Sequence, residues 1–299
     1  MKKYVGIIFV LIAGLLWGTM GVFVKFFTAR NFTSIDTALV RVGIAAILLL
    51  SFNLIKNPKL LKIKLKHIWC FIGSGCLSLL FFSLCYFETI VQSSMSVAAV
   101  LLYIAPVFVM LMSRVVFKTR ITLVKVVAIV LSVLGCALVS GIVGYSESIS
   151  MTALLLGLGS AFGYSLYSIF SKFALQFGYP SITVTTYTFV FAALGLLFFA
   201  DVDFVIANTF TGVSTGIMTI LAGLVSGALP YIFYTKGLEK TEPGKASVVA
   251  SVEPVFATVI SVVFYDEHLS VLQSVGIALV IISIVLIEMG LPKFLRKSR

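Results

Sequence analysis

The chain of 299 residues is 60% hydrophobic and only 11% charged, and its mean hydropathy is +1.16. Soluble globular proteins are about 25% charged, so this composition excludes a soluble enzyme, a secreted disulfide scaffold and a disordered chain. A helix that crosses a bilayer needs roughly 20 apolar residues, so ten crossings would use about 200 residues and leave only short loops. The composition therefore predicts an integral membrane protein without a soluble domain.

The net charge of +11 does not by itself indicate a nucleic-acid partner. The basic residues lie between apolar runs and not along one face, as expected of membrane topology signals, so we predict that nucleic acid is not a partner. All four cysteines lie inside apolar segments without a CxxC pair, and the two histidines, His67 and His268, are far apart. This pattern predicts no disulfide, no metal site and no cofactor.

Ten apolar segments follow one another along the chain, separated by short connections. They cover residues 5–27, 34–55, 68–90, 93–114, 121–141, 151–174, 180–200, 212–236, 244–265 and 270–290. Runs of this length without alternating polarity are helices, because a helix satisfies its own backbone hydrogen bonds in lipid. The first run is longer than the apolar region of a signal peptide, and no small-residue cleavage site follows it, so we interpret it as a retained first helix.

The distribution of Lys and Arg predicts the orientation of these helices. With a cytoplasmic N-terminus, 19 of the 22 basic residues fall on the cytoplasmic side, and only Lys25, Arg30 and Arg41 fall on the other side. Six acidic residues fall on that outer side: Asp36, Glu147, Asp201, Asp203, Asp266 and Glu267. Both termini are therefore predicted to be cytoplasmic, with an even number of helices.

The two halves of the sequence repeat each other at an offset of 148 residues. Leu101–Phe108 (LLYIAPVF) matches Val249–Phe256 (VASVEPVF). Further matched pairs, at this offset or one residue less, are Tyr86 with Tyr234, Trp17 with Tyr164, and Lys25 with Lys172. Five helices in each repeat force the two copies into opposite orientations across the membrane. We therefore predict ten transmembrane helices as two inverted five-helix repeats, residues 1–143 and 144–299.

Several of these motifs resemble those of the drug/metabolite transporter superfamily. They are Trp17-Gly18, Lys25, Arg41, the segments Tyr103–Phe108 and Glu253–Phe256, and the stretch from Asp266 to Ser270. Over nearly its whole length the chain is similar to the EamA family of ten-helix carriers with two EamA repeats. The resemblance implies a carrier in the bacterial inner (plasma) membrane, of a kind that often exports amino acids or related metabolites. One departure is Thr119, which stands where the family usually has an acidic residue, whereas the second repeat keeps Glu267.

Glu253 is the strongest candidate for a functional charge at membrane depth, where an ionisable group costs a few kcal/mol. It lies about ten residues into the ninth segment, beside Pro254, which removes a backbone hydrogen bond. Its counterpart in the first repeat is Ala105. We predict that Glu253 binds substrate and couples transport, and that Pro106 and Pro254 serve in gating. The alternative for Glu253 is a neutral, hydrogen-bonded side chain that stabilises helix packing.

Two further charges lie inside or near apolar segments. Glu88, near the outer end of the third segment, is a second coupling or gating candidate, with an interfacial charge as the alternative. Arg41 lies several residues into the second segment and is predicted to bind substrate through a carboxylate. The alternatives for Arg41 are an ion pair with Asp36 and snorkelling toward the outer surface.

Aromatic residues that carry a polar group complete the candidate site. Six are predicted to bind substrate: Trp17, Tyr86, Tyr103, Tyr164, Tyr167 and Tyr234; Tyr187 and Tyr231 have the same chemistry but are not selected. The repeat-matched pairs carry most weight, and Tyr164 and Tyr167 share a helix face. A buried tyrosine hydroxyl needs a hydrogen-bond partner, which a hydrated cavity can supply. The alternative for each ring is core packing or anchoring at the membrane interface.

Together these features predict a secondary-active transporter and not an enzyme. Inverted repeats place the binding site near the bilayer midplane, between halves that rearrange by alternating access. Because no Walker A motif is present, the driving force would be a proton gradient, exchange or the substrate gradient. The expected partners are a small-molecule substrate, protons and the lipid bilayer, and a homodimer is left open. A membrane channel and a membrane-embedded lipid-modifying enzyme are the alternatives.

Overall fold

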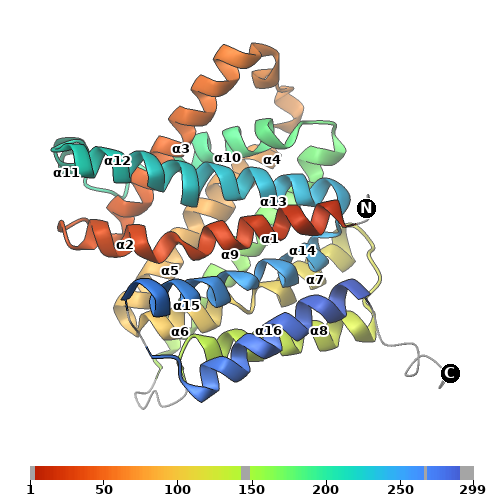
Figure 1. Ribbon diagram of the computed structural model, residues 1–299. Helices are drawn as coiled ribbons and strands as arrows, with labels where there is room; N and C mark the ends of the chain where they lie inside the picture. Colours follow the sequence, from red (N-terminus) through yellow and green to blue (C-terminus); the bar gives the residue numbers. More distant parts are fainter. Residues whose placement is uncertain (1–3, 143–148, 266–267, 290–299) are drawn as a thin grey trace.

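The computed structural model describes residues 4–142, 149–265 and 268–289. Every regular element among these residues is a helix (Figure 1). The predicted boundary between the repeats lies outside the described residues, and so do Glu147, Asp266 and Glu267. The basic residues Lys2, Lys3, Lys293, Arg296, Lys297 and Arg299 also lie outside the described residues.

The helices follow the predicted segments in chain order. The first half contains α1 (Val5–Gly18), α2 (Met20–Thr28), α3 (Ser34–Lys56), α4 (Ile68–Ile72), the π-helical segment η3 (Gly73–Leu80), α5 (Phe81–Gln92), α6 (Met95–Leu102), α7 (Ala105–Val116) and α8 (Leu123–Val139). The second half contains α9 (Met151–Gln176), α10 (Ser181–Leu196), α11 (Val202–Thr209), α12 (Val213–Leu221), the π-helical segment η4 (Ala222–Ala228), α13 (Leu229–Lys240), α14 (Pro243–Ala250), α15 (Val252–Tyr265) and α16 (Val271–Met289). Two short 3₁₀ turns, η1 (Pro58–Leu61) and η2 (Leu65–His67), lie between α3 and α4.

Among the described residues, eight helical stretches of 19 to 28 residues are apolar enough to cross a membrane, and five of them join two or more consecutive elements. Two shorter apolar helices, α8 and α10, occupy the fifth and seventh predicted segments. The short helix α11, which the sequence analysis treated as a connection, lies between α10 and α12. The prediction of an all-helical, multi-pass membrane protein is confirmed.

Helices of each half pack against helices of the other half, so the two halves do not form separate bundles. Helix α1 packs against α13 and α15, while α9 packs against α5 and α7, and α8 lies along α16 (Figure 1). In the repeat, the α1–α13 contact corresponds to α9–α5, and α1–α15 corresponds to α9–α7. At the α8–α16 contact a Cβ on Gly135 would lie 2.8 Å from the carbonyl oxygen of Gly276. The two backbones touch there because neither residue has a side chain.

Two helix breaks lie at matched positions in the halves. Residues 103 and 104 separate α6 from α7, and Ser251 separates α14 from α15, at the offset of 148 residues. Pro106 and Pro254 each follow their break in the first turn of the next helix, where a missing N–H costs no helical hydrogen bond. A third break at Thr19 separates α1 from α2, whereas the corresponding helix α9 is continuous. The breaks are therefore only partly symmetric.

The π-helical segments η3 and η4 also correspond to each other, since they start 149 residues apart and end 148 residues apart. Both lie in the middle of long helical stretches, between α4 and α5 and between α12 and α13. Both pack closely: η3 contacts α9 and α10, and η4 contacts α3. Segments of this kind are rare and are frequently found at functional sites.

Candidate functional site

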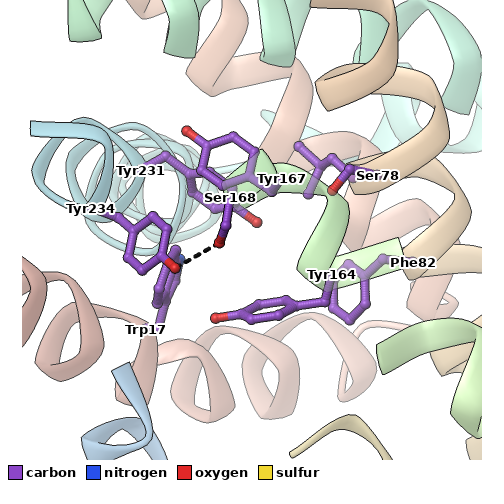
Figure 2. A pocket seen from close by; sticks show the side chains of 9 residues that line it. Trp17, Ser78, Phe82, Tyr164, Tyr167, Ser168, Tyr231 and Tyr234 are labelled. Atoms are coloured by element: carbon purple, nitrogen blue, oxygen red, sulfur yellow. Dashed lines mark hydrogen bonds between the residues drawn. The ribbon is translucent and has the colours of Figure 1, made fainter. Parts of the chain in front are cut away.

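An aromatic cluster lies where α1 meets α9 and α13 (Figure 2). The ring of Trp17, from α1, lies 5.1 Å from Tyr231, 5.3 Å from Tyr234 and 6.1 Å from Tyr164, measured between centroids. Tyr167 lies 4.9 Å from Tyr231. Helix α1 of the first half thus meets α9 and α13 of the second half, and the repeat-matched residues Trp17 and Tyr164 contact each other.

Two tyrosine hydroxyls of this cluster are hydrogen-bonded between α9 and α13. The hydroxyl of Tyr234 lies 2.7 Å from Ser168 Oγ, and that of Tyr167 lies 2.5 Å from Thr235 Oγ1. Both tyrosines are buried, and these bonds satisfy the polar end that burial would otherwise leave without a partner. The bonds hold the two rings in place and join the helices that carry them.

The cavity inside the cluster is small. It is lined by Trp17, Ser78, Leu79, Phe82, Tyr164, Tyr167, Ser168, Tyr231 and Tyr234. The room for the centre of a water molecule is about 10 Å³, which corresponds to roughly one water. A metabolite does not fit without movement of these rings, so this structure holds the aromatic cluster closed.

A second hollow adjoins the first at Tyr164, which lines both. It lies at the matched helix breaks and is lined by Leu102, Tyr103, Ala105, Pro106, Tyr164, Ser247, Ala250, Ser251 and Glu253. The break at Ser251 puts Glu253 in the first turn of α15, where free backbone N–H groups and the helix dipole favour a negative charge. Glu253 is partly buried and lies within electrostatic reach of the Tyr86, Tyr103 and Tyr164 side chains.

Arg41 is buried, with 3% of its surface exposed, and does not snorkel to the outer surface. Its Nη1 donates to the carbonyl oxygen of Ser226, in η4, at 3.4 Å and lies 3.6 Å from the sulfur of Met20. The guanidinium also lies beside the Tyr231 hydroxyl and interacts electrostatically with Glu253. Arg41 therefore lies at the edge of the aromatic cluster, on the side of α2 and α3.

The alternative ion pair between Arg41 and Asp36 is not formed. The Asp36 carboxylate instead accepts hydrogen bonds from the backbone N–H and the hydroxyl of Thr33, at 3.0 and 2.6 Å, in a capping box at the start of α3. Its other oxygen accepts from the backbone N–H of Asp201, at 2.9 Å. The capping bonds are local and satisfy orphan donors of the helix terminus, so they take the carboxylate away from Arg41.

The remaining sequence candidates are distributed around this cluster. Tyr86 contacts the cluster only indirectly: the ring of Phe82 lies between them, 5.6 Å from both Tyr86 and Tyr164 between centroids. Glu88 is exposed on α5, where it accepts a hydrogen bond of 2.8 Å from Gln92 Nε2, and it lines neither hollow. Within the part of the chain that the structure describes, no group of three or more His, Cys, Asp or Glu side chains is placed to hold a metal ion.

The sequence analysis did not select Tyr231, although this residue lies at the middle of the cluster. Its repeat counterpart at the offset of 148 is Ser83, so the repeat gave no signal. The spacing of three residues between Tyr231 and Tyr234 did carry one, since residues three apart share a helix face. Tyr187, also not selected, donates to the carbonyl oxygen of Leu61 at 2.6 Å, in a separate cluster near η1.

The model of the EamA-like transporter family matches residues 4–141 and again residues 151–289. The chain belongs to the EamA-like transporter family. It is 27% identical to the uncharacterized inner membrane transporter YicL of Salmonella typhimurium, over 95% of each chain. It is also 24% identical to the uncharacterized transporter YwfM of Bacillus subtilis, over 96% of this chain and 95% of that protein. The protein is thus a multi-pass membrane transporter.

A solved crystal structure shares the fold of this EamA-like transporter. The two superpose with a TM-score of 0.78, over 98% of this chain and 99% of the other, at 17% sequence identity. At this identity the likeness concerns the path of the backbone. The aromatic cluster and its surroundings are therefore interpreted from the residues of this chain.

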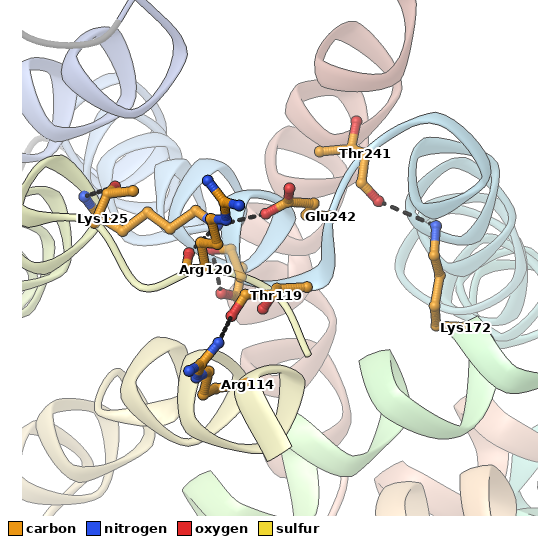
Figure 3. Close-up of polar contacts among 10 residues, drawn as sticks. Arg114, Thr119, Arg120, Lys125, Lys172, Thr241 and Glu242 are labelled. Atoms are coloured by element: carbon orange, nitrogen blue, oxygen red, sulfur yellow. Dashed lines mark hydrogen bonds and ion pairs between the residues drawn. The ribbon is translucent and has the colours of Figure 1, made fainter. Parts of the chain in front are cut away.

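A set of polar contacts lies at the ends of α8, α9 and α13 of the EamA-like transporter, away from the aromatic cluster (Figure 3). Lys125 Nζ, from α8, lies 2.5 Å from Glu242 Oε2, just before α14. Lys172 Nζ, from α9, donates to the carbonyl oxygens of Leu238 at 2.5 Å and Thr241 at 3.4 Å, at the end of α13. A cation at a helix C-terminus compensates the unpaired carbonyl groups there. All these residues lie at helix ends predicted to be cytoplasmic.

Proposed function

We propose that this EamA-like transporter is a secondary-active carrier of a small metabolite, an amino acid or a related compound. In this proposal the carrier exports its substrate across the inner (plasma) membrane by alternating access. It has ten crossings in two inverted repeats, residues 1–143 and 144–299, with both termini in the cytoplasm. The observation that carries the proposal is the aromatic cluster, because rings from both halves close around a cavity of about one water.

The inverted arrangement is supported by two independent features. The charge distribution assigns 19 of the 22 basic residues to one side, and the opposite orientation of the repeats follows from five helices in each. Two similar halves that face each other would produce the matched helix breaks. They would also produce the matching contacts of α1 with the second half and of α9 with the first half. The name of the Salmonella relative supports the inner membrane as the location.

The parts of the site would have distinct roles. Trp17, Tyr164, Tyr167 and Tyr234, with Tyr231, would bind the substrate by ring contacts, while Tyr86 and Tyr103 line its approach to Glu253. Glu253 would carry the proton that couples transport, because it is the carboxylate at the adjoining hollow. The breaks beside Pro106 and Pro254 would let each half helix tilt. Glu88 is left out of the site, because its exposed carboxylate bonds Gln92.

A closed cluster supports a carrier over a channel. A channel needs a continuous pore, whereas here nine side chains leave room for roughly one water. The helix breaks also suit a carrier, because the ends of broken helices expose backbone groups next to the binding site. No group with the geometry of a nucleophile and its base accompanies the tyrosines among the residues lining the two hollows.

Counterflow in proteoliposomes tests this function. Vesicles loaded with one candidate metabolite at high concentration are diluted into a trace of the same labelled compound, across a panel of amino acids and nucleosides. A carrier accumulates label transiently and saturably, and Trp17→Ala lowers that uptake at least about tenfold, as expected when a central binding ring is lost. Uptake that rises linearly with concentration and shows no trans-stimulation would contradict a carrier and favour a channel.

A further inference from the structure

The buried guanidinium of Arg41 has donors that the protein itself does not use. Nη1 bonds the carbonyl oxygen of Ser226, but Nε and Nη2 have no hydrogen-bond partner among the residues that the structure describes. Only 3% of the side chain is exposed. An unpaired donor on a buried charged group costs more than one on a neutral group, so the two free donors require an explanation.

The two free donors lie on the same edge of the guanidinium. Nη2 is the terminal nitrogen on the side of Nε, so the N–H bonds of Nε and Nη2 that point out from this edge are nearly parallel. Two parallel N–H groups match the two oxygens of a carboxylate in a bidentate pair. The edge of Arg41 that the protein leaves free is thus the edge best shaped for a carboxylate.

The charges around Arg41 select the kind of anion. Asp36 is occupied by Thr33 and the Asp201 backbone, and Glu253 makes no ion pair within 4 Å of Arg41, although the two charges interact at longer range. A single guanidinium with the Glu253 carboxylate at longer range suits an anion that carries one negative charge. A phosphate dianion would meet an excess of negative charge there. The surroundings therefore favour a monocarboxylate.

The guanidinium of Arg41 lies next to the aromatic cluster. The Tyr231 hydroxyl lies beside the guanidinium, and the Tyr231 ring contacts Trp17 at 5.1 Å between centroids. Met20 and Ser226, which contact the guanidinium, belong to α2 and η4, next to the break at Thr19 and inside a π-helical segment. Opening of the cluster would bring a bound substrate within reach of this edge.

We propose that the Nε–Nη2 edge of Arg41 is the carboxylate subsite of the transport site. This rests on the proposed function, because it assumes that the aromatic cluster binds the transported molecule. The substrate class that it assigns is a monocarboxylate whose remaining part packs between Trp17 and Tyr231. Glu253 stays free for a proton or for a cationic group of the same substrate.

Matched acids and amides test the subsite. Full-length protein carrying Trp69→Phe, in which Trp17 is the single tryptophan of the sequence, is titrated in detergent with leucine, phenylalanine and lysine and with the amide of each. Trp17 fluorescence reports occupancy. We expect at least one acid to bind at least about tenfold more tightly than its amide, as a site built to hydrogen-bond a group rejects an analogue without it. Arg41→Lys keeps the charge but loses the fork, and should reduce this preference to within about threefold.

The outcomes separate the subsite from the carrier function. The subsite is overturned if no acid binds, if acid and amide bind equally, or if Arg41→Lys, eluting as a monodisperse peak, keeps the wild-type preference. Counterflow of the same compounds is then measured in proteoliposomes. Counterflow of an acid and its amide alike rejects the subsite and supports the carrier. Binding that depends on Arg41 without counterflow supports the subsite and rejects the carrier.

Discussion

Lys125 and Glu242 form an ion pair that joins the first half of the transporter to the second, with 2.5 Å between Nζ and Oε2. Lys125 lies in the first turn of α8, and Glu242 precedes α14, which leads to the break before Glu253. The same lysine also donates to the carbonyl oxygen of Arg120 at 2.8 Å. The contact therefore closes the two halves against each other at the ends predicted to be cytoplasmic.

Breaking this pair should open the cytoplasmic side without unfolding the protein. Glu242 is half-exposed, so the pair stabilises the fold by only about 0–1 kcal/mol, and Glu242→Gln should leave the melting temperature nearly unchanged. In a background free of cysteine, Ser247→Cys in the Glu253 hollow should react several-fold faster with a membrane-impermeant maleimide in inside-out vesicles.

The charge swap Lys125→Glu with Glu242→Lys is the matched control for this experiment. It restores the pair with reversed polarity and should return labelling of the cysteine toward the slow rate. Equal labelling rates in the Glu242→Gln protein and its parent would show that the pair does not hold the cytoplasmic side closed.

Glu253→Gln should remove the pH dependence of transport while the protein stays folded. The glutamine keeps the size and a hydrogen-bonding end but cannot release a proton, so a coupling carboxylate would be lost without a cavity. Initial uptake rates in proteoliposomes from pH 5.5 to 8 measure this. Glu88→Gln, which changes an exposed carboxylate, serves as the comparison. If Glu88→Gln and not Glu253→Gln loses the dependence, the coupling role belongs to α5.

Tyr234→Phe should lower the free energy of unfolding by about 1–3 kcal/mol, because Ser168 then loses a partner in a buried site. The double variant Tyr234→Phe with Ser168→Ala removes both ends of the bond and should be closer to the parent. Denaturant titration in detergent, followed by tryptophan fluorescence, measures both variants and the single variant Ser168→Ala. A double variant destabilised by the sum of the two single effects would mean that the hydroxyls do not interact.

Gly135→Ala should destabilise the α8–α16 contact by about 1–3 kcal/mol, since the added methyl group meets backbone and Val280. Gly43→Ala is the matched control in α3, because nothing lies within 4 Å of its Cβ position. The control should be neutral or more stable by up to about 1 kcal/mol from helix propensity. Thermal unfolding in detergent measures both, and equal melting temperatures would argue against a close backbone contact in solution.

The sequence predicted the helical segments well, because helices in lipid need long apolar runs that are visible in the letters. It also anticipated a disturbed backbone at Glu253, since Pro254 lacks an N–H, although the break itself lies at Ser251. The π-helical segments could not be predicted in this way. They are rare, and the helices that η3 packs against, α9 and α10, are distant in sequence, so no local pattern marks them.

The candidate site was predictable where the repeat marked it and not elsewhere. Trp17 and Tyr164 match in the repeat and do meet, whereas Tyr231 matches Ser83 and was passed over. The ion pair with Asp36 was one alternative for Arg41, suggested by nearness in sequence, and the structure does not form it. The Thr33-x-x-Asp36 spacing, a capping signature readable in the sequence, already committed that carboxylate to the start of α3.

The π-helical segments also set the angular phase of the rings that follow them. Each segment holds about one residue more than an α-helix of the same length, and one residue corresponds to about 100° of rotation. Phe82 follows η3, Tyr231 and Tyr234 follow η4, and all three rings line the aromatic cavity. Their inward direction therefore depends on an extra residue upstream of them. Deleting one residue within either segment would keep every ring yet turn it from the cavity toward a neighbouring helix or lipid.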